Sequence, residues 1–211
     1  PGVTRTRIGD RLCPLLFQSW NGGPPDAHKL SQGLGCETDG TMAEYMVLHE
    51  SGCAPAPANL TDVEAASLPT AGLTAWRAVV TEGRVLPGDV VLVQGTGGVA
   101  LFALQFAKML GAQVICLSSS DAKLGRARAL GADAVINYRT LPEWGRKAKE
   151  LARYSPDKLQ KRKRLLWCIV SRVCRGGQLQ DPNLVFAHRR TIPGRTLRGQ
   201  NNRSLYSTLW M

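Results

Sequence analysis

The chain has 211 residues, of which 44% are hydrophobic, and its 27 Lys and Arg outnumber its 16 Asp and Glu to give a formal net charge of +11. This length and apolar content suffice for one large or two small domains with a buried core. No segment approaches the roughly 20 apolar residues of a membrane span, and no apolar N-terminal stretch is typical of a signal peptide, so we expect no membrane partner.

Residues 1–60 are rich in Gly and Pro and contain short apolar runs such as residues 43–48. This composition is typical of an all-β region made of short strands and loops, and it predicts a strand at 43–48. Thr61 and Glu64 then form a T-x-x-E capping box, in which each side chain satisfies a backbone N–H of the other residue. The pattern predicts that a helix begins at this point.

A second helix is predicted from about residue 71 to residue 81, with Gly83 as its stop signal. Residues 87–89, Pro-Gly-Asp, predict a turn. The apolar, β-branched run 90–94 follows this turn and is typical of a buried parallel strand. The chain therefore changes at this point from helix to strand.

The strand at 90–94 runs directly into a glycine-rich loop, and residues 101–110 then show a helical pattern. The glycines permit a tight turn and a close approach of the backbone to a pyrophosphate, which the N-terminus of the following helix would face. The loop fits the G-x-G-x-x-G/A pattern with a strand before it and a helix after it, which favours a dinucleotide site over a plain strand–turn–helix connection. Its residues are Gly95, Thr96, Gly97, Gly98, Val99 and Ala100.

Two further strand–helix pairs follow the loop. Strands are predicted at 113–117 and at 134–137. The helix between them is capped by Ser120 or Asp121 and ends near Leu130, just before Gly131. A last helix is expected to begin at Thr140, with Pro142 in its first turn, and to end near Ala152. This alternation predicts an α/β fold that contains one half of a doubly wound parallel sheet.

Residues 153–211 do not continue the alternation, and they form a basic, irregular tail that we expect to be poorly ordered. They hold 13 Lys and Arg against two acidic residues, so the rest of the chain is neutral. The basic run 161–164 is typical of a localisation signal or a phosphate-binding patch, but the tail has no recognisable nucleic-acid module, which argues against nucleic acid as a partner. The apolar run 165–170 could pair with the open edge of the strand at 90–94.

Eight segments between residues 9 and 152 resemble the medium-chain dehydrogenase/reductase superfamily, and in particular its zinc-free, quinone-oxidoreductase-like and enoyl-reductase-like branch (alcohol dehydrogenase-like proteins). These segments are residues 9–12, 39–45, 65–69, 73–76, 87–89, 93–99, 130–132 and 135–139. The resemblance implies that residues 1–60 are the remnant of a GroES-like β domain and that residues 61–152 are the first half of a Rossmann domain. It also implies a chain truncated at both ends, with residues 153–211 as a tail outside the family.

The end of the strand at 113–117 bears on the choice of cofactor. NAD-binding folds place a carboxylate there to bind the ribose hydroxyls, but this chain has Ser118, Ser119 and Ser120. Hydroxyl groups can donate to a 2′-phosphate, which a carboxylate would repel. The resemblance adds Lys123 and Tyr138 as residues that flank this phosphate, so NADP is favoured over NAD.

The resemblance also implies a set of cofactor-binding residues. Thr74 matches a position beside the nicotinamide, although a hydroxyl that packs within its helix is an equally good interpretation. The complete set is Thr74, Gly95, Thr96, Gly97, Gly98, Val99, Ser118, Ser119, Lys123 and Tyr138.

No metal site is expected. Related alcohol dehydrogenases hold a catalytic zinc with Cys and His ligands, and the position of their last cysteine ligand matches Thr70 here. The segment where a structural zinc would need four cysteines has only Cys13 and Cys36, and His28 and His49 have no partners at ligand spacing. The six cysteines of the chain show no C-x-x-C spacing, which favours a reducing, cytoplasmic setting.

The expected function is that of a zinc-independent oxidoreductase that transfers a hydride between NADP(H) and a small-molecule substrate, namely an enone, a quinone or a carbonyl compound. No general acid is assigned, and the activity of a fragment is doubtful. Two alternatives stay open: a catalytically inactive cofactor-binding protein, and a basic-tailed protein that contacts nucleic acid or an acidic partner. The resemblance further implies a homodimer for the complete family protein.

Overall fold

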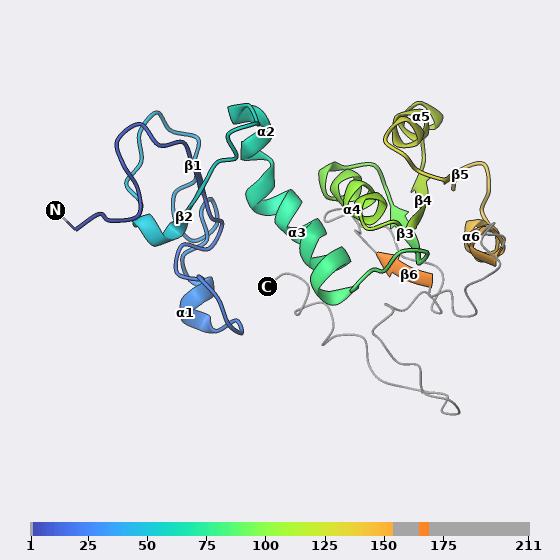
Figure 1. The fold of residues 1–211 in the computed structure, drawn as a ribbon, viewed down its shortest axis with the longest axis horizontal. Helices are drawn as coiled ribbons and strands as arrows, with labels where there is room; N and C mark the ends of the chain where they lie inside the picture. Colours follow the sequence, from blue (N-terminus) through green and yellow to red (C-terminus); the bar gives the residue numbers. More distant parts are fainter. Residues whose placement is uncertain (1, 154–164, 169–211) are drawn as a thin grey trace. The chain divides into compact units, whose positions relative to one another are not determined.

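The computed structural model describes residues 2–153 and 165–168 (Figure 1). Within these residues the chain forms two compact units, one of residues 2–70 and one that begins at residue 71 and includes all four strands of the larger sheet. No helix among the described residues is long and apolar enough to cross a membrane.

The first unit is built around a two-stranded antiparallel sheet. Strand β1 (Leu12–Pro14) pairs with β2 (Cys53–Pro55). A short helix, α1 (Ala27–Leu30), lies in the long connection between them, and a 3₁₀ turn (Glu50–Gly52) precedes β2. Few residues of this unit are buried, so loops contribute most of its structure, as the Gly and Pro content predicts.

The strand predicted at residues 43–48 is not present. This segment forms no ladder, and Tyr45 and Val47 are 90% and 100% exposed. A strand needs a neighbour for its backbone N–H and C=O groups and a surface for its apolar face. The described residues offer this segment neither, so the β-type pattern is not enough to form a strand here.

Helix α2 (Asp62–Ala66) begins at the predicted capping box. Thr61 accepts a hydrogen bond from the backbone N–H of Glu64, and the Glu64 carboxylate accepts one from the backbone N–H of Thr61. The predicted second helix is also confirmed, as a helical run that comprises a π-helical segment (Leu68–Gly72), α3 (Leu73–Trp76) and a second π-helical segment (Arg77–Glu82).

Gly83 ends this run by a different mechanism from the one expected. Its φ is −67°, so it does not occupy the left-handed region. A Cβ at this position would lie 2.6 Å from the carbonyl oxygen of Ala78 and 2.8 Å from that of Val79. The glycine is therefore needed for close approach of the backbone to the last helical turn.

The second unit contains a four-stranded parallel sheet in the order β5-β4-β3-β6 (Figure 1). The strands are β3 (Val90–Gln94), β4 (Gln113–Ser118), β5 (Ala134–Asn137) and β6 (Leu165–Cys168). The three predicted strands are confirmed, and so is the predicted pairing of the apolar run with the open edge of β3. In this register Val90 lies opposite Leu165 and Val93 opposite Cys168, while residues 169–170 lie outside the described residues.

Three helices follow β3, β4 and β5 in turn: α4 (Gly98–Met109), α5 (Asp121–Ala129) and α6 (Trp144–Arg153). Ser120 caps α5, and Gly131 follows its end with a φ of +100°, as predicted. The expected start of α6 at Thr140 is wrong. The Thr140 hydroxyl donates to the carbonyl oxygen of Asn137, in a turn that delays the helix to Trp144.

Alternate residues of β3 face two different hydrophobic clusters. Val91 and Val93 pack in a cluster that contains Leu104 of α4, whereas Val90 and Leu92 pack in one that contains Ala148 of α6. Both faces of the sheet are covered, which explains why β3 is a continuous apolar run with no polar alternation. The carboxyl ends of the strands are left for the loops that carry the candidate site.

Candidate functional site

The glycine loop leaves β3 through a backbone conformation that requires glycine. Gly95 has a φ of +90°, and its N–H donates to the carbonyl oxygen of Leu117 at 2.8 Å, which ties the loop to β4. Gly97 is exposed, and a Cβ there would have no heavy atom within 4 Å. The surface above Gly97 is therefore open to a ligand that approaches the backbone.

Helix α4 begins at this open surface without a side-chain cap. Gly97 occupies the N-cap position and supplies no side-chain hydrogen bond, and α4 then continues for 12 residues. The first-turn N–H groups of a helix carry partial positive charge and need an acceptor. An anionic group such as a pyrophosphate satisfies both requirements, which is the basis of phosphate binding at helix N-termini.

The loop is joined to the end of β4 by two hydroxyl groups. Thr96 Oγ1 lies 3.2 Å from Ser118 Oγ, and Ser118 is only 4% exposed. Ser120 Oγ is used as the cap of α5, where it accepts from the backbone N–H of Lys123. Ser119 is half-buried, and no hydrogen bond of its side chain is found within the described residues. Of the three predicted serines, Ser119 is therefore the one whose hydroxyl is available to a ligand.

The backbone brings Tyr138 and Lys123 to this same end of the sheet. The N–H of Tyr138 donates to the carbonyl oxygen of Ser118 at 3.1 Å, and the Tyr138 side chain is 39% exposed. Lys123 is exposed in the first turn of α5. The two predicted phosphate-flanking residues therefore come from the turn after β5 and from the first turn of α5.

Two residues of this end of the sheet are absent from the predicted site. Asn137 lies opposite Ser118 in the parallel register. Its Nδ2 donates to Oδ1 of Asp121 at 2.9 Å, and its Oδ1 accepts from the backbone N–H of Arg139 at 3.0 Å. The sequence could have indicated Asn137 only as an amide side chain at the last residue of a strand. Its partner Asp121 is 16 residues away, and only the fold brings the two together.

Thr74 lies on α3, which packs against α4. The start of this helical run adjoins the loop, because the Cβ of Ala71 lies 3.6 Å from the position that a Cβ of Gly98 would occupy. Thr74 itself is exposed one turn later. This exposure does not fit a hydroxyl buried in helix packing.

Beneath the loop lie two polar groups that face the interior. The thiol of Cys116 donates to the carbonyl oxygen of Gly95 at 3.5 Å, and burial raises the pKa of this thiol to about 11. Cys116 therefore supports the loop as a neutral thiol. The Nε2 of Gln94, at the end of β3, is buried and has no hydrogen-bond partner within the described residues.

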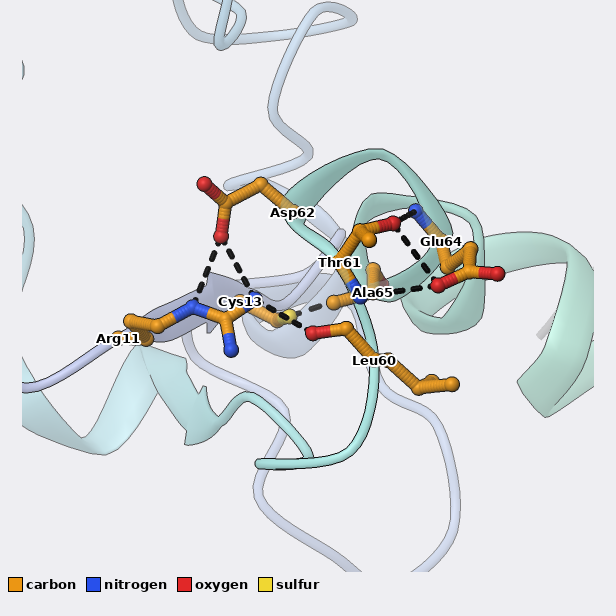
Figure 2. A network of polar contacts seen from close by, with 7 residues as sticks. All are labelled: Arg11, Cys13, Leu60, Thr61, Asp62, Glu64 and Ala65. Carbon is orange, nitrogen blue, oxygen red and sulfur yellow. Dashed lines mark hydrogen bonds and ion pairs between the residues drawn. The ribbon is translucent and has the colours of Figure 1, made fainter.

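The first unit has its own polar network, which Figure 2 shows. The Arg11 guanidinium binds the Asp62 carboxylate and the carbonyl oxygen of Leu60, and the Cys13 thiol donates to the carbonyl oxygen of Ala65. These contacts hold the start of α2 against β1 and leave Cys13 engaged with the backbone. No group of three or more metal-ligating side chains occurs in the part of the chain that the structure describes.

Comparison with known proteins shows which proteins this part of the chain resembles. Residues 98–159 match the family model of zinc-binding dehydrogenases. A zinc-type alcohol dehydrogenase-like protein of Schizosaccharomyces pombe is 42% identical over 145 residues, which cover 68% of this chain and 42% of the relative.

Solved structures give the same result. A structure from Sinorhizobium meliloti 1021 described as an alcohol dehydrogenase has a TM-score of 0.67 at 47% identity and covers 71% of this chain and 45% of that one. The structure of an NAD-dependent alcohol dehydrogenase has a TM-score of 0.63 at 41% identity and covers 72% of this chain and 46% of that one. The chain thus spans less than half the length of the proteins it matches.

The matches bear out the resemblance at the level of the superfamily. The zinc-free, quinone-oxidoreductase-like branch stays a prediction, because the matched family is described as zinc-binding and these relatives are named alcohol dehydrogenases. The parallel sheet, the glycine loop and the sequence identity agree with one another. The part of the chain that these comparisons match is similar in sequence and in fold to the medium-chain dehydrogenase/reductase superfamily.

Proposed function

We propose that this protein is a zinc-independent oxidoreductase that transfers a hydride between NADP(H) and an enone, quinone or carbonyl substrate. The observation that carries the proposal is the exposed surface at Gly97 and the uncapped start of α4, which the Thr96–Ser118 contact joins to the end of β4 beside the half-buried Ser119. This surface combines an anion site with neutral donors. A phosphorylated dinucleotide needs both.

The residues present fit a dinucleotide. The backbone N–H groups at Gly98 and Val99 would hold the pyrophosphate, since no side chain caps them and a Cβ at Gly97 would fill the space that the ligand needs. The Thr96–Ser118 contact keeps the loop aligned with the ribose-binding end of β4. The fit is therefore to the backbone of the loop as much as to its side chains.

The choice of NADP over NAD rests on three side chains. The Ser119 hydroxyl, the Lys123 ammonium and the Tyr138 hydroxyl are all donors, and a dianionic 2′-phosphate accepts from such groups. One matched structure is named an NAD-dependent enzyme, so the preference of this chain has to be measured directly.

A bound nicotinamide would supply or accept the hydride, and the chain fixes the position of the cofactor. In such a reaction the donor and acceptor carbons must be close and aligned, which the protein achieves by fixing the cofactor at its pyrophosphate and ribose. Thr74, exposed on the helix that adjoins the glycine loop, is the residue we assign to the nicotinamide end. No general acid is assigned.

Zinc independence and a cytoplasmic setting belong to the same proposal. Thr70 stands where related alcohol dehydrogenases carry a cysteine ligand, and a hydroxyl is a poor zinc ligand in comparison with a thiolate. Cys13, Cys36, Cys53 and Cys116 are free thiols, which favours a reducing compartment.

The test uses the full 211-residue chain. Titration with NADPH, followed by the fluorescence of the reduced nicotinamide, should show saturable binding, and NADH should bind more weakly. Turnover is then assayed with a panel of enones, quinones and aldehydes, with and without a zinc chelator. Chelator-resistant turnover supports the proposal. Binding without turnover favours the inactive cofactor-binding protein, and a failure to bind either nucleotide refutes both.

A further inference from the structure

The Asp121 carboxylate lies at the point where a free negative charge would matter most for the choice of cofactor. Asp121 is the first residue of α5 and follows Ser119 and Ser120, the serines at the end of β4. A carboxylate at this end of a dinucleotide fold accepts from the ribose hydroxyls of NAD and repels a 2′-phosphate. The chain thus has a carboxylate, which suits NAD, beside hydroxyl and ammonium groups, which suit NADP.

In the structure this carboxylate is held by Asn137. The Asn137 Nδ2 donates to Asp121 Oδ1 at 2.9 Å, and the Asn137 Oδ1 is fixed in turn by the N–H of Arg139 at 3.0 Å. The carbonyl oxygen of Asn137 also accepts from the Thr140 hydroxyl and from the N–H of Leu141. Because both ends of the Asn137 amide are engaged, its orientation is set, and the amide nitrogen must face Asp121.

We propose that Asn137 is a positioning residue that sets the preference for NADP by holding the Asp121 carboxylate away from the ribose. The inference rests on the proposed function and identifies how that site rejects NAD. Asn137 itself need not touch the cofactor. Asn137 lies opposite Ser118 in the sheet, and the Ser118 hydroxyl is already in contact with that of Thr96. The effect of Asn137 on cofactor preference therefore passes through Asp121.

The direction of the effect follows from charge. Without the Asn137 amide, the Asp121 side chain gains rotamers, some of which face the ribose. A carboxylate and a phosphate dianion a few ångströms apart repel even in water, and the repulsion falls with added salt. We expect Asn137→Ala to weaken the binding of 2′,5′-ADP roughly three- to tenfold in low salt and to leave 5′-AMP within about twofold.

The experiment compares these two probes on the full chain, by calorimetric titration at low and high salt. The readout is the ratio of the two dissociation constants, because a merely structural loss would weaken both probes alike. Thr140→Val is the matched control, since it removes a hydrogen bond to the Asn137 carbonyl oxygen and leaves the bond to Asp121 in place. Its ratio should equal that of the wild type.

Asp121→Asn supplies the second half of the test. Because this variant has no charge at residue 121, Asn137→Ala should no longer change the ratio in its background. By itself, Asp121→Asn should bind 2′,5′-ADP at least as tightly as the wild type. This single variant tests the proposal even if Asn137→Ala does not fold, which a thermal melt would reveal.

The outcomes separate the two proposals. Three outcomes would overturn the role of Asn137 and leave the cofactor site standing. The first is an unchanged ratio of dissociation constants in Asn137→Ala, and the second is a change in this ratio that persists in the Asp121→Asn background. The third is weaker 2′,5′-ADP binding in Asp121→Asn alone. If the wild type binds neither probe, the dinucleotide site itself fails, and this inference fails with it. A wild type that prefers 5′-AMP refutes the NADP assignment and, with it, the role of Asn137 in that preference.

Discussion

Replacement of Gly97 by alanine tests the glycine loop most directly, because the structure predicts a large effect on binding and almost none on folding. Gly97 has a φ of −83° and a ψ of 179°, an extended conformation that any residue adopts. A Cβ there meets no heavy atom within 4 Å. The added methyl group therefore costs nothing in contacts within the protein.

The magnitude for stability comes from two opposed effects. Alanine is a poorer N-cap than glycine by about 0.5–1 kcal/mol, whereas loss of glycine from the unfolded chain stabilises the fold by about 0.4–1 kcal/mol. The net change in the free energy of unfolding should lie within about 0.5 kcal/mol. The expected loss of cofactor affinity is larger, because the methyl group occupies the surface that a pyrophosphate needs. Loss of one charge-assisted hydrogen bond costs about 1.5–3 kcal/mol, or roughly 10- to 150-fold in affinity.

The assay is a thermal melt together with an NADPH fluorescence titration, and two other glycines serve as controls. Gly95→Ala should lose about 1–3 kcal/mol of stability, because the φ of Gly95 is +90°. Gly125→Ala, within α5 and with open space around it, should gain about 0.5–1 kcal/mol and bind normally. Unchanged NADPH affinity in Gly97→Ala would refute the assignment of this loop as the pyrophosphate site.

Three further outcomes follow from burial and hydrogen bonding. Leu104→Ala should destabilise the second unit by about 2–5 kcal/mol in denaturant unfolding, because Leu104 is fully buried between α4 and the sheet, and a smaller loss would mean that the cavity collapses. Iodoacetamide at pH 8 should label the exposed Cys36 in native protein and spare Cys116, because burial raises the pKa of the Cys116 thiol to about 11. Equal labelling of the two cysteines, measured by peptide mass spectrometry, would contradict this burial. Backbone and side-chain hydrogen bonds from Thr61 lower the pKa of Glu64, so the capping box should be fully present above the ordinary pKa of glutamate and lost as the pH falls through the lowered value. In an NMR titration the Glu64 pKa should move toward 4.5 in Thr61→Ala, because this variant loses the hydroxyl hydrogen bond and keeps the backbone one. A Glu64 pKa of 4.5 in the wild type would show that the box does not form in solution.

The regular part of the second unit could be predicted from the sequence because each element there has its own local signal. Strands β3, β4 and β5 are apolar runs, and the turns between them contain glycines whose φ is positive, such as Gly111 and Gly131. The pairing of β6 was also predictable, since an apolar strand with an open edge needs a partner.

The errors occur where a local pattern depends on a distant partner. Residues 43–48 have the composition of a strand but no neighbour within the described residues. Thr140 has the side chain of an N-cap, but its hydroxyl bonds to Asn137. In the candidate site the glycines and serines were identified from their order along the chain, whereas the Asn137–Asp121 contact joins a strand end to a helix start and has no local signature.

The position of β6 beside β3 has a consequence for the order of folding. Strands β3, β4 and β5 pair with partners about 20 residues along the chain, whereas Val90 must find Leu165, 75 residues away. Closing the longer loop costs about 1 kcal/mol more in chain entropy. We therefore expect the three-stranded part to assemble first, and the outer edge of β3 to stay open until the more distant strand arrives. During that interval the open edge of this apolar strand can be paired by another molecule, so the yield of refolded protein should fall as its concentration rises.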